Sequence, residues 1–222
     1  MYNIKNKKNN MTIIKQDAID FLHEFEDDSI DLLLTDIPYN VVNRESNGLR
    51  NLDKKDADPF NLNLAELLEL IYKKTKGSIY IFCSTEQISE IRSYFAEKKL
   101  STRTIVWEKT NPSPMNGQHL WLSSIELCVF AKKKNAVFNE YCKSSVLRYP
   151  TVKNKRHPTE KSLQLFRKII ETSSNENDLV VDPFCGSGTT AVAAKLLNRR
   201  FKCCDINDDY ISIAKERIDE EK

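Results

Sequence analysis

The stretch from residue 180 to residue 190, which reads VVDPFCGSGTT, constrains the fold of this chain more than any other feature. It begins with apolar β-branched residues, reaches a carboxylate at Asp182 and turns through Gly186 and Gly188. A helical pattern of apolar residues follows, at Ala191, Val192, Ala194, Leu196 and Leu197. A strand, a glycine turn and a helix in this order bring backbone N–H groups against a bound ligand. The stretch therefore predicts a cofactor site in an α/β fold.

The residues around this turn narrow the choice of cofactor. A nucleotide-triphosphate loop needs a lysine directly after its last glycine, and Thr189 occupies that position. The spacing G-x-G-x-x-A fits a loose dinucleotide fingerprint, with Asp205 at the end of another apolar run, so NAD or FAD stays open. An acid at Asp182 suits a cation better than a pyrophosphate. Two such acids favour S-adenosylmethionine, which carries an ammonium, a sulfonium and a ribose; the alternative is that Asp182 only caps the turn.

A second polar turn, Asp36-Ile37-Pro38-Tyr39, follows the apolar run of residues 30–35, which predicts a buried strand. Open α/β sheets bind ligands at this end of their strands. S-adenosylmethionine carries a methyl group that can be transferred, and an exocyclic amine of a nucleic-acid base is a difficult acceptor because the lone pair of its nitrogen is delocalised into the ring. The Asp36 carboxylate and the Ile37 carbonyl can accept its two N–H bonds, Tyr39 can stack on an extruded base, and Pro38 stiffens the turn. Taken alone, such a tetrapeptide is usually only a turn.

The two turns together resemble those of a known family, the amino DNA methyltransferases, which methylate the exocyclic nitrogen of adenine or cytosine. The turn at 36–39 is similar to the family's Asp-Pro-Pro-Tyr element, with Ile37 in place of the first proline. The resemblance implies that Asp205 holds the ribose hydroxyls of S-adenosylmethionine. It also implies that the loop holds the methionine part, through Asp182, Pro183, Phe184, Cys185, Gly186, Ser187, Gly188, Thr189 and Thr190.

A third element, residues 157–161 (HPTEK), is similar to the His-Pro-Thr-x-Lys element that precedes the cofactor strand in the β group of this family. The resemblance implies that Thr159 and Lys161 meet the carboxylate of the cofactor and that His157 orients the loop. The alternative is a plain helix start with Pro158 in its first turn.

Two weaker elements agree with the same family. Residues 16–18 (QDA) are similar to the element that contacts the adenine of the cofactor, which implies a role for Asp17 and Ala18; the alternative is an ordinary helix cap. Residues 111–114 (NPSP), with Glu126 on the following strand, are similar to the region that shapes the target-base pocket. Trp107 and Trp121 are interpreted as core aromatics rather than stacking residues.

The order of the elements, with 36–39 before 182–190, resembles the β group over most of the chain. It implies a Rossmann-like methyltransferase fold with a mostly parallel twisted sheet of about seven strands and helices on both faces. The alternation of strand and helix patterns along the chain predicts the same α/β architecture. Residues 1–222 are expected to form a single domain.

The distribution of charge is more informative than the net charge of +2. Residues 132–161 hold nine lysines and arginines against two acids, so residues 134–156 are predicted to be a short DNA-recognition segment. The alternative is a solvated lysine-rich surface. Residues 40–59 show no periodicity and are interpreted as a mobile loop at the mouth of the site.

Composition sets further limits. The six cysteines include no C-x-x-C pair, which predicts free, packed thiols and no metal site. No apolar run approaches the roughly 20 residues of a membrane span, and the first residues lack the core of a signal peptide. A cytoplasmic protein without a membrane partner is expected.

These observations predict a site-specific DNA methyltransferase that transfers a methyl group from S-adenosylmethionine to N6 of a flipped adenine. Asp36 in place of serine favours adenine N6; cytosine N4 is the alternative. A non-catalytic relative that binds DNA or cofactor, and an RNA-directed enzyme, also stay open. The resemblance implies double-stranded DNA as the partner, a homodimer, a cognate restriction endonuclease, and a prokaryotic or phage origin.

Overall fold

The computed structural model describes residues 11–39, 62–114, 118–141, 143–152 and 160–220. Helices and strands alternate along this part of the chain, as the sequence predicts. In order they are β1 (Met11–Lys15), α1 (Ala18–His23), β2 (Ile30–Asp36), α2 (Leu64–Lys74), β3 (Thr75–Cys83), α3 (Ile88–Glu97), β4 (Ser101–Lys109), β5 (Ile125–Lys132), β6 (Val146–Tyr149), α4 (Leu163–Ser173), β7 (Leu179–Asp182), α5 (Thr189–Leu196), β8 (Arg200–Asp205) and α6 (Asp208–Glu220).

The strands form one sheet in the order β1-β8-β7-β2-β3-β5-β4-β6. All neighbouring strands run parallel except β5, which is antiparallel to both β3 and β4. The predicted mostly parallel sheet is therefore confirmed, but it has eight strands instead of about seven. The unpredicted strand is β6, a four-residue edge strand with alternate residues exposed. So short an edge strand carries too little apolar periodicity to be detected in the sequence.

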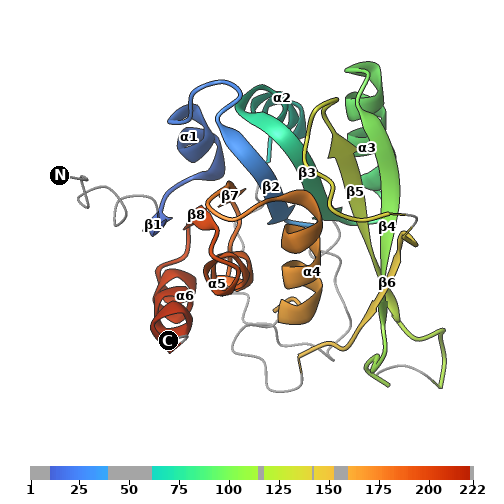
Figure 1. Ribbon diagram of the computed structural model, residues 1–222. Coiled ribbons are helices and arrows are strands. Elements are labelled where there is room, and N and C mark those ends of the chain that lie inside the picture. Colours follow the sequence, from blue (N-terminus) through green and yellow to red (C-terminus); the bar gives the residue numbers. More distant parts are fainter. Residues whose placement is uncertain (1–10, 40–61, 115–117, 142, 153–159, 221–222) are drawn as a thin grey trace.

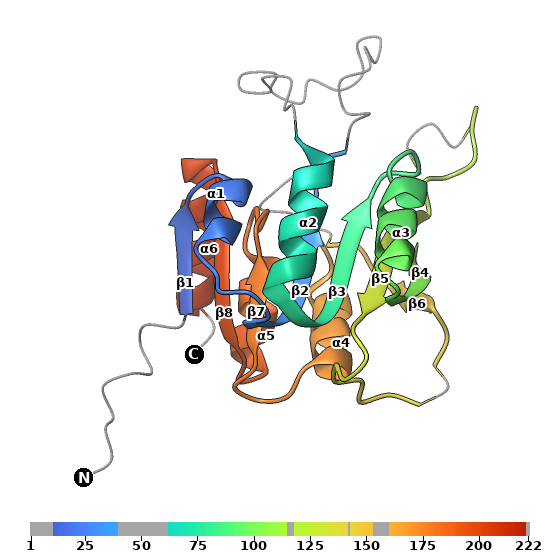
Figure 2. The same cartoon turned by 90° about the horizontal axis from the view of Figure 1, so that it is seen from above.

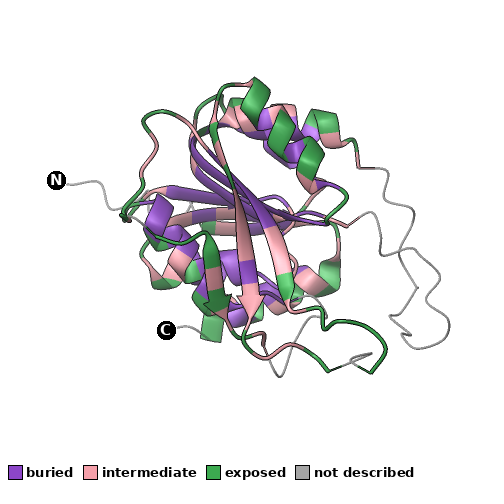
Figure 3. Ribbon diagram, turned by 90° about the vertical axis from the view of Figure 1, so that its right-hand side faces the viewer, coloured by how far each residue is buried: buried purple, intermediate pink, exposed green. Residues whose placement is uncertain are grey.

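Helices cover both faces of the sheet, with α1, α2 and α3 on one face and α4, α5 and α6 on the other (Figures 1 and 2). Because side chains alternate along a strand, each central strand supplies both layers. Leu33 and Ile81 pack in the cluster that includes α2, whereas Leu34 and Phe82 pack in the cluster that includes α4 and α5. Figure 3 shows the buried residues along the central strands and the exposed residues on the outer helix faces.

Two helices, α3 and α4, have starts that the sequence does not locate. Gln87 is the N-cap residue of α3, and the Gln87 side chain accepts a 3.1 Å hydrogen bond from the Ser84 backbone N–H. Residues 160–162 are not helical, so α4 begins at Leu163, after Ser162, and not at Pro158. Pro158 itself lies outside the described residues.

The core contains five cysteines of the described part as free buried thiols, which confirms the packed thiols that were predicted: Cys83, Cys128, Cys185, Cys203 and Cys204. The interpretation of both tryptophans as core residues is confirmed for Trp107, which is 1% exposed, and wrong for Trp121, which is 100% exposed. No helix among the described residues has both the length and the apolar character needed to cross a bilayer.

Candidate active site

The sheet places the two predicted polar turns at the same edge. β2 and β7 are neighbouring parallel strands, with Leu33 opposite Val181, so Asp36 and Asp182 end adjacent strands. The Thr35 hydroxyl donates a 2.7 Å hydrogen bond to Oδ1 of Asp182. This bond ties β2, which ends at Asp36, to β7, which ends at Asp182. Ligands of open α/β sheets bind at this edge.

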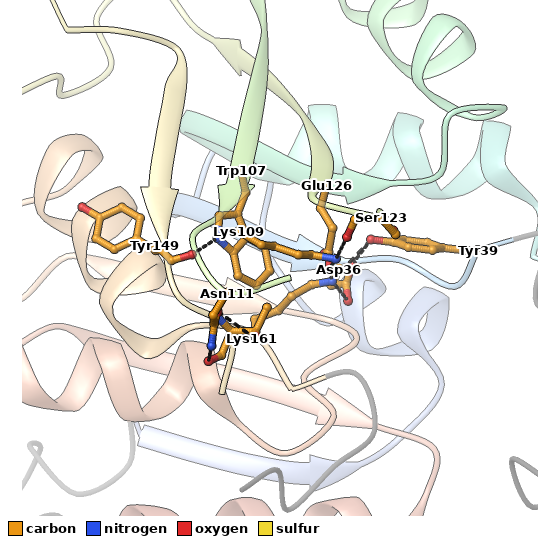
Figure 4. Close-up of polar contacts among 10 residues, drawn as sticks. Asp36, Tyr39, Trp107, Lys109, Asn111, Ser123, Glu126, Tyr149 and Lys161 are labelled. Carbon is orange, nitrogen blue, oxygen red and sulfur yellow. Dashed lines mark hydrogen bonds and ion pairs between the residues drawn. The ribbon is translucent and has the colours of Figure 1, made fainter. Parts of the chain in front are cut away.

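Lys161 lies between two carboxylates, those of Asp36 and Glu126 (Figure 4). Lys161 Nζ lies 2.9 Å from Asp36 Oδ2 and 2.5 Å from Glu126 Oε2. The Tyr39 hydroxyl donates a 2.9 Å hydrogen bond to Asp36 Oδ1 and lies 3.3 Å from Lys161 Nζ. Lys109 Nζ lies 3.0 Å from the other oxygen of Glu126. The Lys161 side chain is only 8% exposed, so these charges interact away from bulk water. Asp36, Tyr39, Glu126, Lys109 and Lys161 are called the target-base cluster below, after the role that the family resemblance implies for the turn at residues 36–39.

Burial and charge pairing set the protonation of the target-base cluster. Burial lowers the pKa of Lys161, but the carboxylates of Asp36 and Glu126 outweigh that effect and the pKa rises overall. Burial raises the pKa of Glu126, and Lys161 and Lys109 outweigh it, so that pKa falls. For Asp36 burial outweighs Lys161 and the pKa is raised. Asp36 is therefore the carboxyl of the cluster that takes up a proton most readily.

Lys161 lies at the target-base cluster, whereas the resemblance implies contact with the cofactor. Its role at the cofactor stays a prediction, and His157 and Thr159 of the same element lie outside the described residues. Asn111, from the region expected to shape the pocket, accepts a 2.6 Å hydrogen bond from the backbone N–H of Thr151 and donates a 3.2 Å bond to the Thr151 carbonyl. Asn111 thus fixes the segment that follows β6.

The turn at residues 36–39 is fixed by contacts of Ile37 and Pro38 with buried residues. Ile37 is 1% exposed, packs with the α2 face, and its backbone N–H donates a 3.2 Å hydrogen bond to the Phe82 carbonyl. The buried Gln87 side chain donates a 3.1 Å hydrogen bond to the Pro38 carbonyl. Gln87 was not expected at the site, because a single glutamine near a predicted helix start gives no signal. The catalytic roles predicted for Asp36, Ile37, Pro38 and Tyr39 stay predictions.

The glycine turn has the backbone geometry that the sequence indicates. Gly186 has φ +47° and Gly188 has φ +79°, in the left-handed region that favours glycine. The turn is closed by hydrogen bonds from Cys185 N–H to the Cys204 carbonyl, at 2.9 Å, and from Gly188 N–H to the Cys185 carbonyl, at 2.8 Å. A Cβ on Gly188 would lie 2.7 Å from the Cβ of Ala214, so the glycine also lets α6 approach the start of α5.

We expect Gly188→Ala to lower the free energy of unfolding by about 1–3 kcal/mol, because it combines an unfavourable φ with a steric overlap. Urea unfolding followed by circular dichroism measures this change. Lys215→Ala, next to Ala214 but exposed, is the matched control and should leave stability within about 0.5 kcal/mol. Equal stability of Gly188→Ala and wild type would contradict the close approach of α6.

The Asp182 side chain is buried between the end of β2 and the start of α5. It is 3% exposed and accepts hydrogen bonds from the hydroxyls of Thr35 and Thr190 and, at 3.0 Å, from the Phe184 backbone N–H. The last contact is the turn cap that was the alternative interpretation of this residue. Burial raises the pKa of Asp182 to about 7, and the three hydrogen bonds offset only part of that effect. Its direct contact with the cofactor stays a prediction.

The raised pKa of Asp182 makes stability depend on pH. Its carboxyl has an ordinary pKa of 3.8 and a folded-state pKa of about 7, so between these values the folded state holds more protons than the unfolded state. The contribution of Asp182 to stability is therefore lost as pH rises through this window. We expect Asp182→Asn, which cannot ionise, to gain stability relative to wild type as pH rises from 4 to 7 in urea unfolding. A constant difference would show that Asp182 ionises normally.

The remaining residues that are predicted to bind the cofactor lie at the next two strand ends. Asp205 accepts a 2.9 Å hydrogen bond from the Gly186 N–H and a 3.0 Å bond from the Asn207 N–H. Lys15 of β1 is opposite Asp205 of β8, which brings the start of α1 beside it. Asp17 caps α1 by accepting a 2.8 Å bond from Ile19 N–H, so the helix-cap interpretation of Asp17 is confirmed. The cofactor roles of Asp205, Asp17 and Ala18 stay predictions.

Arg217, a buried residue that was not expected at the site, connects the glycine turn to the residue before Lys161. Arg217 Nη1 lies 2.8 Å from the Ser187 carbonyl and 3.2 Å from the Thr189 hydroxyl. Arg217 Nη2 lies 3.0 Å from Glu160, which precedes Lys161 in the chain. Arg217 is 9% exposed although it lies in the last turn of α6. It gave no signal in the sequence because a single arginine in a charged terminal helix is usually solvated.

The predicted DNA-recognition segment carries less unpaired charge than its composition indicates. Lys143 pairs with Glu140, and Arg148 of β6 pairs with Glu108 at 2.9 Å. Lys153, Lys155, Arg156 and the whole interpreted loop 40–59 lie outside the described residues. The role of residues 134–156 stays a prediction.

Known proteins are similar to this chain in sequence and in fold. A family model described as DNA methylase matches residues 30–216. The type II methyltransferase M.HpaI of Haemophilus parainfluenzae is 34% identical over 240 residues, which cover 94% of this chain and 74% of that protein. The DNA adenine methyltransferase YhdJ of Escherichia coli (strain K12) is 29% identical over 248 residues, covering 94% and 82%. The crystal structure of the M1.HpyAVI–SAM complex matches with a TM-score of 0.72 and 31% identity, over 93% of this chain and 99% of that one.

Together with these similarities, the sheet order and the two turns at one edge identify an α/β methyltransferase. More narrowly, the chain belongs to the N6/N4 DNA methylase family, whose model matches from the start of β2 into α6.

Proposed function

We propose that this chain transfers a methyl group from S-adenosylmethionine to the exocyclic N6 of an adenine flipped out of double-stranded DNA. One observation carries the proposal: Asp36 and the glycine loop lie at the ends of neighbouring parallel strands, which the hydrogen bond from Thr35 to Asp182 ties together. When bound, S-adenosylmethionine supplies an electrophilic methyl group on its sulfonium. A base held at Asp36 and a cofactor held at the loop would share one edge of the sheet.

The described residues fit this cofactor. The turn through Gly186 and Gly188 presents backbone without side chains at the start of α5. Asp205 and Asp17 supply carboxylate oxygens at the next two strand ends, where the hydroxyl groups of a ribose could donate to them. Similarity to M1.HpyAVI, which was solved as its SAM complex, supports the same ligand here.

In this proposal the target-base cluster holds the amine. Asp36 Oδ1, which accepts the Tyr39 hydroxyl in this structure, would accept an N–H of the base when the Tyr39 ring moves to stack on it. Lys161 would keep its contact with Oδ2 and fix the carboxylate. After transfer the nitrogen carries one proton too many, and Asp36, with its raised pKa, is placed to take it.

Adenine N6 is proposed as the methylated position, and cytosine N4 is the alternative. The acid at the head of the turn and the similarity to a DNA adenine methyltransferase support adenine. To test this, duplex DNA is incubated with cofactor labelled on its methyl group, then digested to nucleosides and separated. Label in N6-methyl-2′-deoxyadenosine supports the proposal, and label in N4-methyl-2′-deoxycytidine supports the alternative. Acid-stable label in RNA but not in DNA would point to an RNA-directed enzyme, and no label in either to a non-catalytic relative.

The sequence context of the methylation can be measured in cells. Single-molecule sequencing of DNA from bacteria that express the chain would report both the modified base and its neighbours. We propose that the chain acts on double-stranded DNA and forms a homodimer, which sedimentation velocity with and without a duplex would test. The family resemblance also implies a cognate restriction endonuclease. We propose that this nuclease cuts the same DNA sequence when that sequence is unmethylated.

A further inference from the structure

Three consecutive apolar side chains lie in water between β4 and β5. Leu120 is 71% exposed, Trp121 is 100% exposed and Leu122 is 42% exposed. We call these three residues the apolar tip. They belong to the connection that projects beyond the ends of the sheet in Figure 1. Exposed apolar groups of this kind mark a surface that meets a partner.

The apolar tip is attached directly to the target-base cluster. Ser124 N–H donates a 2.8 Å hydrogen bond to the Leu122 carbonyl, and Lys109 N–H donates a 2.7 Å bond to the Ser124 carbonyl. The Lys109 ammonium lies 3.4 Å from the Ser123 carbonyl (Figure 4) and also pairs with Glu126. Glu126 in turn contacts Lys161, the partner of Asp36. The same lysine therefore holds the stem of the apolar tip and belongs to the target-base cluster.

We propose that the apolar tip inserts into the DNA base stack, with Trp121 filling the space that the flipped base leaves. This inference rests on the proposed function. A base that reaches Asp36 must leave its duplex close to the stem of the apolar tip. Extrusion breaks stacking on both neighbouring bases, and an aromatic or aliphatic wedge replaces part of that stacking. Trp121 presents the largest aromatic surface available among the twenty side chains and has no packing to lose.

The size of the apolar tip favours a wedge over a subunit interface. A stable interface buries about 800 Å² on each partner, whereas one aromatic side chain buries about 150–250 Å². The residues on either side of the apolar tip are polar: Gln118 and His119 before it, Ser123 and Ser124 after it. A narrow apolar projection between polar neighbours fits the spacing of a base step better than a broad protein face.

The tryptophan content of the chain allows a direct test of contact. The chain has two tryptophans, and Trp107 is buried while Trp121 is fully exposed. Titration with an unmethylated duplex that contains the sequence methylated by the protein should quench the fluorescence of Trp121, because the indole stacks on the DNA bases. Trp121→Phe retains only Trp107, so the quenching should disappear. Unchanged emission of wild-type protein on a duplex that it binds, as measured by anisotropy of a labelled duplex, would overturn the proposal.

Methylation kinetics test the role of the wedge. Trp121→Ala should lower kcat/KM on a fully paired duplex by about 5- to 150-fold, the range expected for loss of one stacking contact. Trp121→Phe should retain most of the rate. On a duplex whose target base is mismatched, and therefore already unpaired, the loss caused by Trp121→Ala should shrink, because less stacking must be replaced. Leu196→Ala, at an exposed apolar position of α5, is the control and should behave as wild type on both duplexes.

The outcomes are separable. If wild type labels DNA and Trp121→Ala shows the same rate, or the same loss on paired and mismatched duplexes, the wedge is wrong and the proposed function stands. If wild type does not label DNA, the proposed function fails, and loss of quenching in Trp121→Phe still reports whether the tip contacts bases. Self-association that shifts Trp121 emission without DNA, and that Trp121→Ala abolishes in sedimentation velocity, would overturn the wedge in favour of a second copy of the chain.

Discussion

Replacing Asp36 by alanine is expected to lower kcat for methyl transfer by at least about 1000-fold while the affinity for S-adenosylmethionine stays close to wild type. The variant removes the carboxylate that would orient the amine and take its proton. It should not remove the fold, because Lys161 keeps Glu126 as a partner at 2.5 Å. Single-turnover transfer to DNA measures the first quantity, and isothermal titration of the cofactor measures the second.

Two companion variants sharpen the Asp36 experiment. Asp36→Asn keeps one carbonyl acceptor but cannot accept the proton, so it should fall between alanine and wild type. Asp27→Ala removes a largely exposed carboxylate that pairs with Lys74 and should leave transfer unchanged, because Asp27 precedes the start of β2 whereas Asp36 ends that strand. Loss of cofactor affinity in Asp36→Ala, with little change in kcat, would mean that the two turns have been assigned to the wrong ligands.

Replacing Lys161 by methionine is expected to lower transfer at neutral pH by about 100-fold, because it leaves two carboxylates without the ammonium between them. Asp36 and Glu126 then share a buried site, and the pKa of Asp36 rises further than burial alone raises it. Since Asp36 must be ionised to accept an N–H bond, the acid limb of the pH–rate profile should move to higher pH. Measurement of kcat from pH 6 to pH 9 checks this shift.

A double variant separates charge from packing at Lys161. Lys161→Met with Glu126→Gln has one carboxylate again, so its acid limb should return toward the wild-type position. The cofactor affinity of Lys161→Met decides a second question. An affinity close to wild type would agree with the contacts seen in this structure. A large loss of affinity would instead support the contact with the cofactor's carboxylate that the family resemblance implies.

The parts of this structure that could be predicted are those that leave a local pattern in the sequence, such as an apolar run or a pair of glycines. The strands before Asp36 and Asp182 could be located because they are apolar runs that end in an acid, and the left-handed glycines because only glycine adopts such φ values without strain. Parallel strand ends meet at one edge, so the α/β alternation placed both turns at the same edge of the sheet, whereas the pairing of β2 with β7 was visible only in the structure. The edge strand β6 was missed because its four residues carry no such pattern.

Residues that act through long-range contacts were not predictable. Gln87 reaches the Pro38 carbonyl, and Arg217 reaches Ser187, only after the chain has folded. Lys161 was recognised as part of a motif, but its position against Asp36 depends on how the chain before α4 meets the sheet, where Phe166 of α4 stacks on Phe82 of β3. Trp121 is a common core type of residue, and only the structure places it in water.

The contacts of Arg217 give α6 an importance that the exposed charged residues of this helix conceal. The guanidinium contacts the Ser187 carbonyl, 30 residues earlier, and Glu160, which precedes Lys161 of the target-base cluster. A protease that cuts α6 ahead of Arg217 would therefore remove a support of the glycine turn at residues 186–188 and leave the buried Glu160 without this cation. Under the proposed function, limited digestion of α6 should thus abolish methyl transfer well before the sheet itself is cut.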